Sequence, residues 1–337
     1  MNNETIDLYS SNRIEYIKEI QKELKQSYPS DNGLKIPEIL MLNFANNYKA
    51  NTNNNFQQFW YYDYGVDNPQ ELLTSLKNRN FICIASAKNC LKYLKLIELK
   101  NLLKELGLKT NGKKEELIVR IIDNTNDEWL DKKIIERNYE LTELGLNELK
   151  ENEYVMYFHK IKFKYAMSVW WMNHQLHKQP KKTFRDVMWG EFNKRIQDAM
   201  ERIKVGDYSS YIRLKSQMCD FLLEEDKFET ALILLTESTY FDVNVYCKPY
   251  FKNRDFNEYS RSTENDIFNV KRFEVIKTKT NCSDNAFFEK LKSAFDRYFF
   301  KEPIMSSADL SGIILLLINN EYDKIEYLLN KLKSELK

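Results

Sequence analysis

Apolar residues recur at spacings of three and four along most of this chain, which is the pattern of amphipathic helices with one buried face. The segment 10–26 shows the register clearly, with Ile14, Ile17, Ile20 and Leu24. Only eight glycines and six prolines interrupt the 337 residues, and this scarcity of chain breakers disfavours a turn-rich all-β fold. We therefore expect a protein of mainly α fold class.

Two helical hairpins are predicted in the C-terminal part of the chain. Segments 212–238 and 312–332 each contain an apolar helical run, a polar turn with an aromatic residue, and a second apolar run. The form resembles tetratricopeptide-like hairpins, although a separation of about ninety residues excludes a regular short-period array. We predict a helical-hairpin domain at 196–337 that holds a protein partner or a second copy of the chain in a homodimer.

The remaining sequence divides into three further predicted regions. An N-terminal helical segment covers 1–55, and a basic, aromatic, helical segment covers 157–195. Between them, region 56–160 reads as helix, turn and strand over 68–85, then as strand, turn and helix over 137–152. This order is compatible with the two halves of a winged helix, so 56–160 is predicted to be winged-helix-like.

The stretch "LKNLLKELGLKTNGKKEELIVRII" (99–122) lies between these two halves. Gly107 is expected to end a first helix in the left-handed conformation, and a second helix is expected from about Lys113. Either Thr110 or Asn111 is expected to cap that second helix. We predict two helices packed on one small core. Its expected apolar positions are Leu94, Leu96, Leu99, Leu102, Leu103, Leu106, Leu117, Ile118, Ile121 and Ile122.

Local charge, rather than net charge, points to a partner for this stretch. The whole chain carries 51 basic and 50 acidic residues, so any nucleic-acid site must be local. From Lys92 to Arg120, eight basic and four acidic residues leave +4. A helix start also offers free amides and a partial positive charge to an anion. Lys113 and Lys114 at such a start favour phosphate contact; the alternative is that they only solvate an exposed helix end.

The same segment resembles the SAP motif, a helix–extended loop–helix DNA-binding module. The resemblance lies in Leu96, Leu99, Lys100, Leu103, the "LGL" of 106–108, the "TNGKK" of 110–114, Leu117 and Arg120–Ile121. It places a SAP motif at 91–125 and implies binding of double-stranded DNA with weak sequence preference, often for AT-rich tracts. Asn111 departs from the small hydroxyl residue that family members often have there. The implied DNA-binding residues are Lys95, Lys100, Thr110, Asn111, Gly112, Lys113, Lys114 and Arg120.

A wider resemblance concerns architecture alone. The arrangement of 55–160 looks like that of SAP-containing proteins of Firmicutes and their phages. This resemblance implies no chemical reaction. Some SAP modules bind RNA or protein, so the motif by itself leaves the choice of partner open.

Residues 157–185 contain no acidic residue and seven basic ones. Aromatic residues interleave with them, a combination that suits phosphate contact together with base stacking. The alternative is a helical segment with an aromatic core face and a solvated basic face. His174 and His177 are three residues apart, but without an HExxH motif we predict no metal. The basic residues that would extend a DNA footprint are Lys160, Lys162, Lys164, Lys178, Lys181, Lys182 and Arg185.

The motifs of common enzymes are missing from the sequence. The five cysteines are scattered, without CxxC or zinc spacing, and neither GxxxxGK[ST] nor GxSxG occurs. No apolar signal core begins the chain, and the apolar run at 312–318 is too short for a bilayer. We expect a cytoplasmic, nucleoid-associated DNA-binding protein that is not an enzyme and has no cofactor. The alternatives are an interaction scaffold that the SAP unit only tethers, and a DNA-acting enzyme with an unrecognised site.

Overall fold

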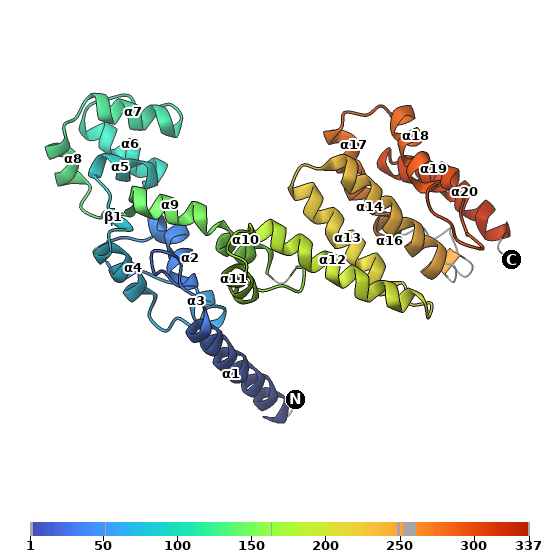
Figure 1. Cartoon of the computed structure of the whole chain (residues 1–337). Coiled ribbons are helices and arrows are strands. Elements are labelled where there is room, and N and C mark those ends of the chain that lie inside the picture. The colour runs from blue at the N-terminus through green and yellow to red at the C-terminus, as the bar shows by residue number, and fades with distance from the viewer. Residues whose placement is uncertain (1–2, 51, 163, 248–249, 252–260, 336–337) are drawn as a thin grey trace. The chain divides into compact units, whose positions relative to one another are not determined.

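The computed structural model describes residues 3–50, 52–162, 164–247, 250–251 and 261–335. The fold is mainly helical, as predicted (Figure 1). The chain forms two compact units, 1–187 and 188–337. The division falls inside helix α12 (Phe184–Ile203), before the predicted domain start at 196.

Unit 1 contains most of the short elements. It also contains two short strands, and two of its helical turns are of the 3-10 type. The elements are α1 (Asn3–Gln26), α2 (Ile36–Phe44), η1 (Ala45–Asn47), α3 (Phe59–Tyr62), α4 (Pro69–Asn78), β1 (Ile82–Ile84), α5 (Ala87–Cys90), η2 (Leu91–Tyr93), α6 (Leu96–Glu105), α7 (Lys114–Asp123), α8 (Asp127–Lys133), β2 (Tyr139–Leu141), α9 (Glu143–Glu151), α10 (Glu153–Ile161) and α11 (Val169–Lys178).

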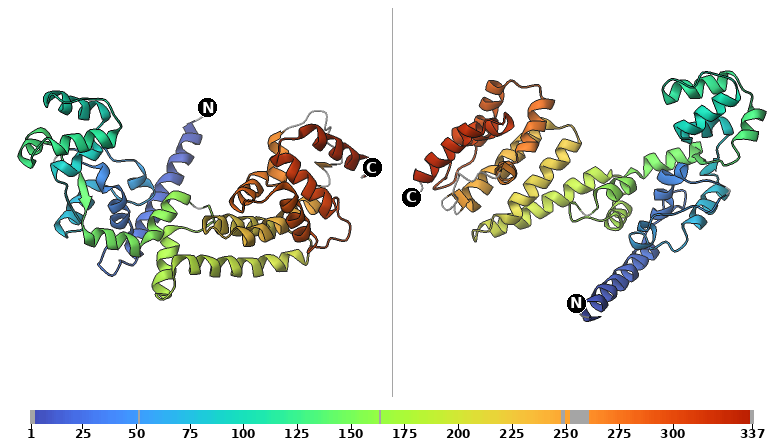
Figure 2. Two further views of the ribbon diagram at one scale, coloured as in Figure 1. Left: turned by 90° about the horizontal axis from the view of Figure 1, so that it is seen from above. Right: turned by 180° about the vertical axis from the view of Figure 1, so that it is seen from behind.

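The two predicted strands pair with each other across an insertion. Strand β1 pairs antiparallel with β2, and Cys83 lies opposite Glu140. On the other edge of β2, Lys49 forms an antiparallel bridge with Asn138. Helices α5–α8 therefore stand where a hairpin would have its turn, and they gather on one side of the strands while α2, α4 and α9 lie on the other (Figure 2). The winged-helix-like character of region 56–160 stays a prediction.

A close backbone approach docks α9 on the strand region. Thr142 caps the helix by accepting a hydrogen bond from the Gly145 amide at 3.2 Å, and its hydroxyl donates to the Asn80 carbonyl at 2.7 Å. A Cβ on Gly145 would lie 2.2 Å from the Phe81 carbonyl oxygen. Only glycine therefore permits this contact, which holds the returning chain against β1.

The core of the inserted unit is larger than the two helices predicted for it. Leu99 and Leu103 of α6 and Leu117 and Ile121 of α7 are fully buried, as expected. They form one cluster with apolar residues of α5 and of the segment that includes α8, among them Ala87, Cys90, Leu130 and Ile134. Leu96, expected in the core, is 43% exposed, because it is the first residue of α6 and points away from the packed face. The SAP-like unit is thus a small bundle of its own, braced by its flanking helices.

Unit 2 is a set of packed helices. They are α13 (Ser209–Glu224), α14 (Phe228–Phe241), the π-helical turn η3 (Asp242–Tyr246), α16 (Arg261–Ile267), α17 (Val270–Lys279), α18 (Asp284–Phe295), α19 (Ser307–Ile318) and α20 (Tyr322–Glu335). The two predicted hairpins are present as α13–α14 and α19–α20. Their core draws on residues between 219 and 329 and includes the fully buried Phe273, Phe287 and Phe295.

Asparagine and aspartate end several helices where glycine is the usual choice. Asp226 and Asn320, in the turns of the two hairpins, have φ of 56° and 58°. The next residue donates back to the fifth carbonyl before it, Lys227 to Leu222 and Glu321 to Leu316, each at 2.9 Å. This is the Schellman motif, and asparagine and aspartate tolerate its left-handed residue better than other side chains. A helical chain can therefore turn often with few glycines.

Candidate nucleic-acid interface

The loop between α6 and α7 begins with a helix end of the predicted kind. Gly107 has φ of 68°, and the Leu108 amide donates to the Leu103 carbonyl at 2.8 Å. Leu108 then packs on the unit's core. Further along, Gly112 has φ of 130°, a backbone conformation that residues with a side chain rarely adopt. The path of the loop therefore favours glycine at position 112.

The start of α7 differs from the expectation that Thr110 or Asn111 would cap it. The N-cap residue is Lys113, and no side chain caps the helix amides that follow it. Instead Glu116, in the first turn, accepts from the Lys113 amide at 3.1 Å. The reason is the length of the loop: residues 110 and 111 lie between the end of α6 and Lys113, so neither occupies the N-cap position of α7.

Helix α6 starts in the same way as α7. Glu98 accepts from the amide of its N-cap residue, Lys95, at 2.5 Å. Sequence reasoning missed this device, although a glutamate three residues after each N-cap lysine, the acidic half of a capping box, could have revealed it. Of the four acidic residues between Lys92 and Arg120, Glu98 and Glu116 therefore accept hydrogen bonds from the amides of N-cap residues.

A lysine side chain links the two helix starts. Lys114 Nζ donates to the Lys92 carbonyl at 2.8 Å, which ties the first turn of α7 to the turn that precedes α6. Lys92, Lys95 and Lys113 are exposed around this tie. The structure therefore brings together basic residues that are about twenty positions apart in sequence.

The other predicted contact residues are distributed over the same unit. Asn111 and Gly112 are exposed in the loop, and Thr110 is half-buried beside them. Lys100 is half-buried on α6, one turn beyond the helix start. All of these residues belong to the loop or to the helices that it joins.

Arg120 supports the loop from within. Its Nη1 donates to the carbonyls of Lys109 and Asn111, at 2.5 and 3.0 Å. The guanidinium thus holds both ends of the "KTN" segment to α7. The DNA contact predicted for Arg120 stays a prediction, and its hydrogen bonds show that it also positions the loop.

Substitution of Arg120 separates these two roles. We expect Arg120→Lys, which keeps the charge but ends in an ammonium on a shorter side chain that does not place a donor where Nη1 lies, to weaken duplex binding nearly as much as Arg120→Gln, by about three- to tenfold. The measurement is fluorescence anisotropy with a labelled duplex at fixed salt. If Arg120→Lys binds like the wild type, Arg120 acts through its charge rather than through the loop.

The basic segment 157–185 is divided by the fold. Lys160 and Lys162 lie at the end of α10, and Lys164 follows in the loop, whereas Lys178 ends α11 and the loop after it carries Lys181 and Lys182. Apart from Arg185, these residues are exposed. Lys162 forms an ion pair with Asp63 at 3.2 Å, and Arg185 lies over the Tyr157 ring, 5.7 Å from its centroid. The seven charges form two groups, one before and one after α11.

Most of the aromatic residues of this segment belong to the core. Trp170 is 4% exposed and Tyr165 is fully buried, and Phe158 and Phe184 are also buried. Trp171 is half-buried, and Phe163 lies outside the described residues. Burial removes these buried rings from base stacking, so the alternative of an aromatic core face with a solvated basic face describes the segment better.

The two histidines of α11 face the end of α1. His174 Nε2 lies 3.7 Å from Glu23 Oε2, and the His177 ring stacks on Tyr28 with centroids 3.5 Å apart. Over the described part of the chain, no three histidine, cysteine or carboxylate residues gather as a metal site would require.

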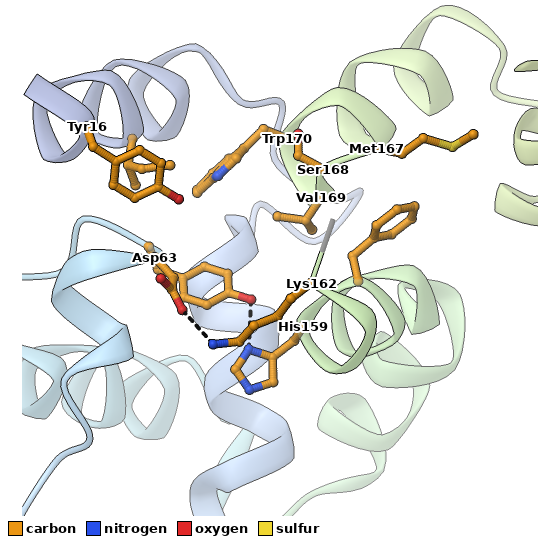
Figure 3. A pocket seen from close by; sticks show the side chains of 11 residues that line it. Tyr16, Asp63, His159, Lys162, Met167, Ser168, Val169 and Trp170 are labelled. Atoms are coloured by element: carbon orange, nitrogen blue, oxygen red, sulfur yellow. Dashed lines mark hydrogen bonds and ion pairs between the residues drawn. The ribbon is translucent and has the colours of Figure 1, made fainter. Parts of the chain in front are cut away.

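A small cavity in unit 1 collects the titratable groups nearest to an enzyme-like arrangement (Figure 3). The Tyr64 hydroxyl is 2.9 Å from His159 Nδ1, and Lys162 pairs with Asp63 beside them. The cavity holds only about 60 Å³, room for roughly two water molecules. Trp170 packs on Tyr64, so we interpret this cluster as a hydrogen-bonded aromatic core.

His159 gives unit 1 a defined dependence on pH. Burial lowers the pKa of His159 below its ordinary 6.5, and Lys162 adds to the effect. Its contribution to stability is therefore complete above pH 6.5 and is lost as the pH falls below that value, because the unfolded chain takes up the proton first. We expect the melting temperature of unit 1 to fall between pH 7.5 and 5.5, and less so in His159→Gln. Equal pH dependence in both proteins would contradict this assignment.

A loop and two helix starts carry a local positive charge on a small helical bundle, and a helix start is a place where free amides can hold an anion. Residues 90–126 match the SAP domain family, so the chain carries a SAP domain at this place. The match supports nucleic-acid binding in general. No curated protein and no solved structure matches the chain.

Among the described residues, no helix combines the length and the apolar character that a membrane span requires.

Proposed function

We propose that the protein binds double-stranded DNA through its phosphate backbone, with weak sequence preference. The phosphate face consists of Lys92, Lys95, Lys113 and Lys114 together with the loop 109–112. The observation that carries the proposal is the hydrogen bond from Lys114 to the Lys92 carbonyl, because it gathers both helix starts of the SAP domain on one face. Basic side chains and uncapped helix amides are the groups that hold phosphate.

The same face accounts for the low sequence preference that we propose. Backbone contacts fix position on the duplex but read no bases, and Thr110 and Asn111 are the uncharged polar side chains of the loop 109–112. We propose at most a modest preference for AT-rich tracts. The proposal includes a cytoplasmic, nucleoid-associated role. It includes no chemical reaction.

Unit 2 is proposed to provide the second function, contact with a protein partner or with another copy of the chain. It has its own core of buried residues from α13 to α20, so its fold does not depend on the SAP domain. A single SAP domain neutralises few phosphates, and a second linked copy would raise the effective affinity. In the rival account unit 2 alone acts as a scaffold, and loss of DNA binding would leave that activity intact.

The salt dependence of binding tests the proposal. Labelled duplexes of about 30 base pairs, AT-rich and GC-rich, are titrated with the full chain at several salt concentrations. With about four or five neutralised phosphates, the slope of log K against log salt should be between about −3 and −5. The two duplexes should differ by less than about threefold. Absence of binding at low salt, or a slope near zero, would reject the phosphate face.

A further inference from the structure

A groove of about 620 Å³ lies between the SAP domain and the strand region of unit 1. Its walls come from α6, from the end of α8, and from the backbone on either side of the Lys49–Asn138 bridge. The volume is within the range of small-ligand sites. Most of these walls lie outside residues 90–126, so the groove is a feature of how this chain carries its SAP domain.

The groove continues the proposed phosphate face. Lys95, the N-cap residue of α6, lines it together with Tyr93. Tyr93 follows Lys92, whose ammonium group lies 5.0 Å from the Tyr93 ring centroid and whose carbonyl receives Lys114. Suppose that a DNA duplex is held at the two helix starts. A single DNA strand that extends from this duplex would then meet the groove first.

The lining has the three kinds of group that an unpaired nucleotide needs. Leu102 and Ile134 are buried and give an apolar floor, on which the face of a base can pack beside Tyr93. Asn47 and Asn101 are exposed at its edge. Neither amide has an intramolecular hydrogen bond within the part of the chain that the structure describes, and an amide can match the edge of any base.

Three lysines line the same groove, and two of them are ion-paired with glutamates. The three are Lys95, Lys49 and Lys133; Lys133 forms an ion pair with Glu105, and the two glutamates in the lining are engaged as well. Glu136 forms an ion pair with Lys49, and Glu98 accepts from the Lys95 amide. Bases of an intact duplex are stacked and cannot enter such a groove, whereas those of a single strand can.

We propose that this groove binds a single-stranded extension of the DNA whose duplex part occupies the SAP domain. The proposal rests on the proposed function and narrows its substrate to junctions between duplex and single strand. Such junctions occur at processed ends, gaps and forks.

The test compares three DNA probes of equal sequence in their common part. They are a blunt duplex, the duplex with an extension of about six nucleotides at its 3′ or its 5′ end, and a blunt duplex longer by about three base pairs, which matches the added phosphates. The full chain should bind one of the extended duplexes about tenfold more tightly than the phosphate-matched blunt duplex.

A charge-neutral variant assigns the gain to the groove. Asn47→Ala/Asn101→Ala should lose most of the tenfold gain and bind the blunt duplex like the wild type. The matched control is Asn78→Ala/Asn147→Ala, which removes two exposed amides of α4 and α9 and should keep the gain.

Each outcome decides one of the two proposals. If the blunt duplex binds but neither extension adds affinity beyond added phosphates, the groove proposal is wrong and the proposed function stands. An equal gain in the wild type and in Asn47→Ala/Asn101→Ala also overturns the groove. If only extended probes bind, through the two asparagines, the duplex face is rejected, and with it the claim that the groove acts together with a bound duplex; the groove then binds single-stranded DNA by itself.

Discussion

Lys113→Glu/Lys114→Glu is expected to bind duplex DNA at least about 100-fold more weakly than the wild type at low salt, because two phosphate contacts become two repulsions. The salt slope should fall by about two. The variant should still fold, since acidic residues are favourable at a helix start and only one hydrogen bond, from Lys114 to Lys92, is lost. Anisotropy titration gives the affinity, and circular dichroism checks the fold.

The matched control changes the same net charge elsewhere. Lys77→Glu/Lys150→Glu reverses two exposed lysines of α4 and α9, away from both helix starts. If this control loses as much affinity as the first variant, binding follows overall charge and has no specific face.

Leu117→Ala is expected to have the second large effect. Leu117 is fully buried in the SAP-domain core, and truncation of such a leucine costs about 2–5 kcal/mol. In a small bundle, this loss of stability should disorder α7. The N-terminal end of α7, which carries Lys113 and Lys114, should be disordered with it. We expect the unfolding transition of unit 1 to shift and most of the duplex affinity to disappear.

A leucine of unit 2 provides the counterpart. Leu235 is fully buried in α14, so Leu235→Ala should destabilise unit 2 by a similar amount and leave duplex affinity unchanged. Urea unfolding and anisotropy measure the two effects separately. Equal loss of DNA binding in both variants would mean that the phosphate face needs unit 2.

The sequence was sufficient for elements whose signal is local. Helical spacing located both hairpins of unit 2 and both helices of the SAP domain, and Gly107 marked a helix end correctly. Each of these depends on residues within one or two turns of each other. The SAP resemblance worked for the same reason, since its residues at 96–121 are contiguous.

What the sequence could not supply depends on contacts between distant residues. The bridge from Lys49 to Asn138 and the hydrogen bond from Lys114 to Lys92 join positions with no common local pattern. From the sequence alone, the aromatic residues of 157–185 suited base stacking as well as they suited a core face. The sequence could not decide between the two, because burial depends on the helices that pack around these residues. The extent of the predicted domains and the DNA-binding role of each lysine stay predictions.

Hydrogen exchange of the full chain, alone and with duplex DNA, tests the central claim most directly. The amides of Lys114, Glu115 and Glu116 have no side-chain cap, so they should exchange fast in the free protein. We predict strong protection by duplex over residues 92–98 and 109–117, and none over 209–335. Protection confined to residues 178–185 or to unit 2, with residues 109–117 unchanged, would contradict the account.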